Sequence, residues 1–266
     1  MKPILFFIAL ISCNLNAQNN RDTSKLHKWI LKHNFTVSAG YFRANYKKQD
    51  LLVVQPNYQR SIRFFDVEAN DLSYFENISD FQITATQHRV NFTANFKYNF
   101  QIGLNISHLN YGANTNKFYR AQGTWDGKHV NDTLLMNQYV KALFHTNGMN
   151  FWNISLRKIL PIYNRYKNFK VLLNLGIHSG ACFTSSEIEI KDTVVNKFLY
   201  YTPGNKIAGY NLGVNSSLDI LFFKHYLLQP FWDWSFAYLH KAPFNDGYVR
   251  QKIYANYCGI NVGYRF

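Results

Sequence analysis

The sequence predicts a single membrane-spanning antiparallel β-barrel, most economically with eight strands. Segments in which apolar and polar residues alternate recur from Phe35 to the last residue, Phe266. The connections between these segments alternate between long and short, as in barrels with long loops at one end and tight turns at the other. No run of about twenty apolar residues follows the amino-terminal segment, so a helical membrane protein is excluded.

Composition agrees with this class and limits the partners. The chain of 266 residues is 18% aromatic and has a net charge of +14. Its mean hydropathy is slightly negative because lipid-facing and lumen-facing residues cancel in any window of a barrel. If the barrel lies in an outer membrane, the phosphates of lipopolysaccharide are abundant partners for such an excess of Lys and Arg. Nucleic acid is not expected as a partner, because no recognition motif accompanies the charge and the amino-terminal signal sends the chain out of the cytoplasm.

The amino-terminal segment predicts export. Met1 and Lys2 precede an apolar run over 4–11, which is typical of a signal peptide and too short to span a bilayer. We expect residues 1–17 to be removed by cleavage after Ala17. The alternative is a lipobox ending at Cys13, which would leave that cysteine acylated.

A short periplasmic segment, 18–33, is expected to follow the signal peptide. Leu26, Trp29 and Ile30 are spaced as on one face of a helix, and lysines surround them. The segment is either an amphipathic helix on the membrane surface or a polar leader.

The barrel domain is predicted over 34–266. Each strand shows apolar and polar residues in alternation, and only Asn99 separates the second strand from the third, which predicts a hairpin with its turn on the periplasmic side. The predicted strands are 35–42, 89–98, 100–107, 152–157, 169–178, 208–220, 228–238 and 253–266.

The connections divide into two groups. Those over 45–86, 112–148 and 184–206 are long and that over 241–249 is moderate, whereas those at Asn99, 161–168 and 223–225 are short. Long loops are expected outside the cell and short turns in the periplasm. Strand-like patches occur within the long connections, at 62–67 and in 184–206. If these patches cross the membrane, the barrel has ten or twelve strands and would serve as a small porin.

The carboxyl-terminal strand has one apolar face. Tyr254, Cys258, Ile260, Val262, Tyr264 and Phe266 share one parity of the sequence IYANYCGINVGYRF, which ends on an aromatic residue. This terminus resembles that of Gram-negative outer-membrane β-barrels. The resemblance implies location in the outer membrane and recognition by the barrel-assembly machinery through this strand.

Charged residues on the predicted inward faces form a second candidate feature. An eight-stranded barrel is just wide enough for side chains to fill, so charges inside it must pair or hydrogen-bond. We expect these residues to form a structural network that plugs the lumen: Arg89, Lys97, Arg157, Lys170, Asp219, Asp233 and Arg265.

Function is therefore expected in the extracellular loops. The loop over 112–148 contains Lys117, Arg120, Trp125 and Lys128, which offer cations for phosphates and an aromatic anchor. The prediction is a binding or structural role towards lipopolysaccharide or a neighbouring outer-membrane protein. No metal site or cofactor is expected, because no two histidines have a short metal-ligand spacing.

The alternative function is enzymatic. The segment His145-Thr146-Asn147-Gly148 faintly resembles the His-x-Ser-Asn segment of outer-membrane lipid A deacylases, which implies His145 as a general base. Such an acyl hydrolase or acyltransferase would need a nucleophile from another loop, where Ser185 or Ser186 is available.

The two remaining cysteines, Cys182 and Cys258, could form a disulfide in an oxidising compartment. One follows a predicted strand and the other lies on the apolar face of the last strand. We therefore expect two small apolar side chains.

Overall fold

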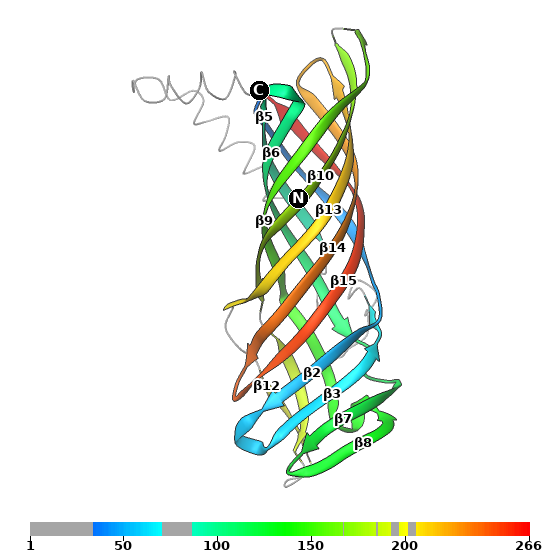
Figure 1. The fold of residues 1–266 in the computed structure, drawn as a ribbon, viewed down its shortest axis with the longest axis vertical. Coiled ribbons are helices and arrows are strands. Elements are labelled where there is room, and N and C mark those ends of the chain that lie inside the picture. Colours follow the sequence, from blue (N-terminus) through cyan, green and yellow to red (C-terminus); the bar gives the residue numbers. More distant parts are fainter. Residues whose placement is uncertain (1–33, 71–86, 167, 185, 193–196, 202–205) are drawn as a thin grey trace, which may run out of the picture.

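Eight strands close into a single ring in the computed structural model, which describes residues 34–70, 87–166, 168–184, 186–192, 197–201 and 206–266 (Figure 1). The first and last strands pair from Thr36↔Arg265 to Tyr46↔Ala255, and every pairing in the ring is antiparallel. The predicted eight-stranded barrel is confirmed. The ring consists of β1 (Thr36–Tyr46), β5 (His88–Phe96), β6 (Phe100–Ala113), β9 (Val140–Tyr166), β10 (Phe169–Thr184), β13 (Lys206–Phe222), β14 (Tyr226–Phe244) and β15 (Gly247–Arg265).

One end of the ring has only tight turns. The 3-10 turn η3 (Lys97–Asn99) joins β5 to β6, and a turn containing Phe223 and Lys224 joins β13 to β14. Both of the latter residues have positive φ, 50° and 70°, as the tightest hairpin turns require. The carboxyl terminus lies at the same end, at the top of Figure 1. Lys97, which we expected on an inward strand face, instead lies in the turn.

The opposite end carries the long connections, and these fold into further strands. β2 (Gln49–Gln55), β3 (Arg60–Val67), β7 (Phe118–Trp125) and β8 (Lys128–Leu135) extend the sheet in this order from the outer part of β15. β11 (Glu187–Asp192) pairs with β9 and with β12 (Lys197–Tyr201), and the short β4 (Ala69–Asn70) pairs with β6. The 3-10 turns η1 (Pro56–Tyr58) and η4 (Met136–Gln138) complete this part. We call it the dome.

The dome strands do not belong to the ring. The patch at 62–67 is indeed strand, and 184–206 contains a β-extension, but both lie beyond the end of the ring (Figure 1). A barrel of ten or twelve strands is therefore wrong. The small-porin alternative that depended on it loses its basis.

Polarity within the ring is inverted relative to a water-soluble protein. Asn91, Asn105, Asn153 and Asn174 are buried inside, whereas large apolar side chains are exposed on all eight ring strands, with Tyr41 from β1 and Phe96 from the end of β5. A continuous exposed belt of this kind is what a lipid-facing surface requires. Members of the belt at least 45% exposed include Tyr41, Ile102, Trp152, Ile154, Leu156, Ile162, Ile177, Tyr210, Leu212, Val214, Trp232, Trp234, Tyr254, Ile260 and Val262.

The dome has its own apolar core. Its side chains come from the dome strands and from the outer parts of the ring strands, so the dome closes over the outer mouth of the barrel. Among its fully buried members are Leu51, Val53, Ile62, Phe64, Leu109, Met136, Leu143, Met149, Ile188, Leu239 and Val249. Burial of these apolar side chains favours folding of the dome sheet over the end of the ring.

Several predictions at the termini lie outside the described residues, namely the signal peptide, the alternative lipidation at Cys13 and the segment 18–33. Among the residues that the structure describes, no helix is long and apolar enough to cross a membrane. Cys182 is buried and Cys258 is exposed, and neither forms a disulfide. They face opposite sides of the barrel wall.

Candidate functional site on the dome

Cationic and aromatic side chains form a stripe across the outer face of the dome. Register places Arg250 of β15 opposite Leu52 of β2, Leu52 opposite Arg63 of β3, and Arg63 opposite Gln122 of β7. Because neighbouring strands lie about 4.8 Å apart, these residues make a continuous row on one surface. We call the following six residues the cation–aromatic stripe: Lys241, Tyr248, Arg250, Arg63, Phe65 and Arg120.

Each aromatic ring in the stripe has two cations over it. The Arg63 guanidinium carbon lies 4.8 Å from the Phe65 ring centroid, and that of Arg120 lies 5.7 Å from it. Lys241 Nζ lies 5.4 Å from the Tyr248 centroid, and the Arg250 guanidinium carbon lies 6.0 Å from it. These contacts order long side chains that would otherwise be mobile on a surface. The stripe therefore presents positive charge in a fixed arrangement.

A groove of about 380 Å³ adjoins the stripe between β3 and β7. Glu68 lies at its edge, 2.5 Å from Lys117 Nζ and 3.4 Å from Lys48 Nζ. The hydrogen bond from Lys117 lowers the pKa of Glu68 from its usual 4.5, and the same contact raises the pKa of Lys117. Phe118 is 70% exposed beside them. The groove thus offers an accessible ring and the cations of Lys48, Lys117 and Arg120, beside the carboxylates of Asp66 and Glu68.

The four loop residues selected from the sequence have different environments. Lys117 and Arg120 are exposed beside the groove, and Lys128 is exposed where β8 begins. Trp125 is only 3% exposed, because it packs in the dome core against Tyr139 with a centroid distance of 5.0 Å. It therefore lies away from any surface partner.

Sequence reasoning missed most of the stripe. Arg63 and Phe65 lie in the strand-like patch 62–67, and Tyr248 and Arg250 lie in the connection 241–249. Alternation in both segments could have placed these residues on one face. What the sequence could not give was the pairing of β2 with β15, which brings the two segments together.

The barrel interior contains most of the predicted charge network. Arg89 Nη1 donates to Asp233 Oδ2 at 3.0 Å, and His178 Nε2 lies 3.0 Å from Asp233 Oδ1. All three side chains are at most 6% exposed. A cavity of only about 10 Å³ adjoins them, which is room for one water at most. His178 was not predicted as a member, although it follows the inward parity of its strand.

A second group of predicted charges lies nearer the periplasmic end. Arg265 Nη2 is 3.8 Å from Asp219 Oδ2, and Gln229 Nε2 donates to Asp219 Oδ1 at 2.6 Å. Arg157 donates to Asn105 Oδ1 at 3.2 Å and has no carboxylate at ion-pair distance among the described residues. Lys170 is half-buried at the start of β10. These contacts fill the lumen as a structural network would.

The predicted general base lies inside the dome. Ser186 Oγ is 3.1 Å from His145 Nδ1, and His145 Nε2 is 3.0 Å from Gln251 Oε1. The Gln251 amide donates in turn to the Tyr111 hydroxyl. A serine from another loop therefore does reach the histidine, but both side chains are 0% exposed. Ser185 lies outside the described residues, and the described part of the chain holds no cluster of metal ligands.

No family model matches this sequence, and no curated protein matches it either. Among solved structures, the chain is similar to Neisserial surface protein A at 8% identity and TM-score 0.36, covering 88% of this chain and 97% of that one. It is similar to the outer membrane protein OprG from Pseudomonas aeruginosa at 11% identity and TM-score 0.41, covering 88% and 96%. It is also similar to Ail, the attachment invasion locus protein of Yersinia pestis, at 8% identity and TM-score 0.34, covering 88% of this chain and 99% of that one.

The closed ring and its apolar exterior, and not these low similarities, identify the chain as a membrane-spanning barrel. Only closed barrels and helices satisfy their backbone hydrogen bonds in lipid, and tight turns at one end with long connections at the other are typical of outer-membrane barrels. The chain is an outer-membrane β-barrel, as predicted.

Proposed function

We propose that this protein is a non-channel outer-membrane barrel whose dome binds the phosphorylated saccharide of lipopolysaccharide. The observation that carries the proposal is the cation–aromatic stripe, in which Phe65 and Tyr248 each have two cations over the ring. Guanidinium groups suit phosphate oxygens because they can donate two parallel hydrogen bonds. A neighbouring outer-membrane protein with an acidic surface is the competing partner for the same stripe.

A binding role fits the interior better than transport does. The lumen is occupied by the Arg89–Asp233 and Arg265–Asp219 groups, and the dome core lies over the outer mouth. A solute would have to break both layers to cross. Insertion by the barrel-assembly machinery through β15 and export by the signal peptide 1–17 belong to the same proposal.

Binding to O-deacylated lipopolysaccharide tests the stripe, because this ligand keeps the phosphates but lacks the acyl chains. The variant Arg63→Gln/Arg120→Gln removes two stripe cations. A matched control, Lys128→Gln/Lys141→Gln, removes two exposed cations outside the stripe, one on β8 and one on the outer part of β9. Each double variant contains one cation that is paired with a carboxylate, Arg63 with Asp50 and Lys141 with Glu189.

We expect binding to weaken by about tenfold or more in the stripe variant, since each charged hydrogen bond contributes about 1.5–3 kcal/mol. The control should stay within about twofold of the wild type, a residual effect of long-range charge. Equal losses in both variants would show that net charge, and not the stripe, attracts the ligand. If an acidic outer-membrane protein binds the stripe and O-deacylated lipopolysaccharide does not, the competing partner replaces lipopolysaccharide in the proposal.

A second candidate function, acyl hydrolysis or transfer on lipid A, is supported by the contact between Ser186 and His145. With Gln251 accepting from Nε2–H, the Nδ1 lone pair can accept the serine proton, which is the arrangement of an activated nucleophile. Their complete burial opposes it, because an acyl ester would need the segment before β11 to move. Mass spectrometry of lipid A from cells with wild-type protein or Ser186→Ala decides: a changed acylation pattern supports the enzyme, and an identical one removes it.

A further inference from the structure

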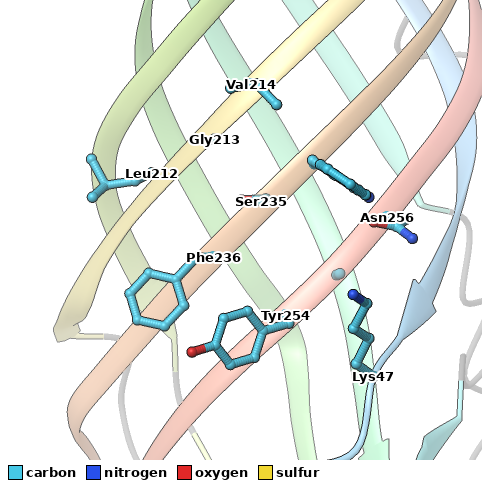
Figure 2. Close-up of a pocket in the computed structure, with 10 residues that line it drawn as sticks. Lys47, Leu212, Gly213, Val214, Ser235, Phe236, Tyr254 and Asn256 are labelled. Atoms are coloured by element: carbon cyan, nitrogen blue, oxygen red, sulfur yellow. The ribbon is translucent and has the colours of Figure 1, made fainter.

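The barrel exterior has a groove of about 430 Å³ at its outer edge, across β13, β14 and β15 (Figure 2). Its floor is the backbone at Gly213, Ser235 and Ala255, because these positions face the barrel interior and place no large side chain on the exterior. Outward-facing apolar side chains form its walls: Leu212, Val214, Trp234, Phe236 and Tyr254. The volume lies within the usual range of small-molecule sites, about 300–1,000 Å³.

The position of the groove relative to the bilayer follows from β15. Outward-facing side chains of β15 include Tyr264, Val262, Ile260 and Tyr254, whereas the next two outward-facing residues beyond Tyr254 are Lys252 and Arg250. Ten residues at about 3.3 Å each, tilted by about 45°, span roughly 23 Å, close to the apolar band of about 25 Å in such barrels. The outer rim of the groove therefore lies at the level of the outer-leaflet headgroups.

The cationic side chain of Lys47 lies at this rim. The backbone N–H of Lys47 donates to the carbonyl of Tyr254 at 2.9 Å, which fixes the residue beside β15. Its Nζ lies 5.8 Å from the Trp234 ring centroid, and Figure 2 shows the side chain extending over the groove from the strand end. Lys252, the next outward-facing residue of β15 beyond Tyr254, is also exposed. The outer end of the groove is thus positive, and apart from Asn256 the outward-facing side chains that line the rest of it are apolar.

We propose that this groove binds one phosphorylated, acylated lipid of the outer leaflet, with an acyl chain between Val214 and Phe236 and a phosphate on Lys47. The charge distribution selects this occupant, because an apolar slot leading to a headgroup-level lysine complements a lipid phosphate with its chain. The inference rests on location in the outer membrane and not on the ligand of the dome. The stripe lies beyond the outer rim of the groove, on the part of the sheet that extends past the bilayer, so the two sites bind different parts of the surface layer.

Native mass spectrometry of the detergent-purified full chain with added diphosphoryl lipid A tests the groove. Lys47→Gln removes the phosphate contact, and Val214→Trp fills the slot with an outward side chain. Lys128→Gln is the matched control, a lysine of the dome far from the bilayer. Phosphatidylcholine, which has chains but no net charge, is the control lipid, and a heat-dependent gel shift confirms that each variant is folded.

We expect the wild type and Lys128→Gln to retain one lipid A, with about tenfold weaker retention in Lys47→Gln and loss in Val214→Trp. Arg63→Gln/Arg120→Gln should retain lipid A as the wild type does, even if the dome proposal fails. Unchanged retention in both groove variants would overturn the inference. So would a dimer that Val214→Trp dissociates without a change in lipid retention, because the groove would then hold a second copy of the chain.

Discussion

Asp233 is the counter-charge of the buried Arg89 in the barrel interior, so replacing it with a neutral residue should lower the free energy of unfolding. Its side chain is 3% exposed, accepts from Arg89 at 3.0 Å and lies at the same distance from His178. Asp233→Asn keeps the volume but leaves the Arg89 guanidinium buried without a counter-charge. Removing one partner of a buried pair costs about 3–5 kcal/mol. We expect a loss of this size in the free energy of unfolding, measured by urea titration of the barrel in liposomes.

The same experiment contains its own controls. Arg89→Met/Asp233→Asn removes both charges and should recover most of the loss, because neither charge then remains unpaired. The exposed pair Arg63–Asp50, with side chains 51% and 37% exposed, should cost no more than about 1 kcal/mol when Asp50 is changed to Asn. The reasoning is refuted if Asp233→Asn unfolds within about 1 kcal/mol of the wild type, or if the double variant is the less stable of the two.

Three further predictions follow from the wall, the dome and the lumen. Gly213→Ala should destabilise the barrel by about 1–3 kcal/mol in the urea titration, because the added Cβ would lie 1.9 Å from His178 Nε2; His178→Ala should recover part of this loss. The folded-state pKa of Glu68 is lowered, so its contribution is present above its usual 4.5 and disappears as the pH falls through the folded value. Protection factors for hydrogen exchange in β7, which are corrected for the intrinsic pH dependence of exchange, should therefore fall in acid for the wild type and change less in Lys117→Met. Planar bilayers containing the protein should show no steady open-channel current, and step-like conductance would contradict the filled lumen.

The eight ring strands were predictable from sequence because membrane barrels keep a strict two-residue period. On β5, for example, Asn91 and Thr93 are buried inward, whereas Val90 and Phe92 are half-exposed on the opposite parity, as the alternation indicates. Turn positions followed from the same period, since a single residue at Asn99 left no room for anything but a hairpin. Lys97 was misplaced because a 3-10 turn ends the period one residue before it.

The dome was harder to predict, although one signal was present. β7 and β8 meet at Asp126-Gly127, both with positive φ (49° and 76°), and Asp-Gly between two strands is the strongest short-range hairpin signal. The polar residues of 112–148 concealed it, because only one face of this hairpin is buried. The contact of Ser186 with His145 joins residues 41 positions apart, one in the ring strand β9 and the other immediately before β11, so spacing alone could not establish it.

The parity of β15 continues unbroken from the periplasm into the dome, while the polarity of its two faces exchanges. Towards the carboxyl end the inward residue is Asn261 and the outward residue Ile260, but towards the outer end the inward residue is Val249 and the outward residue Arg250. Lipid surrounds the first part and water the second, so each face changes its chemistry at the level where its surroundings change. The two-residue alternation of β15 is the same in its membrane part and in its dome part, so alternation alone does not show where the polarity of the two faces exchanges. It places the membrane boundary beside Tyr254, where the exterior groove and Lys47 meet.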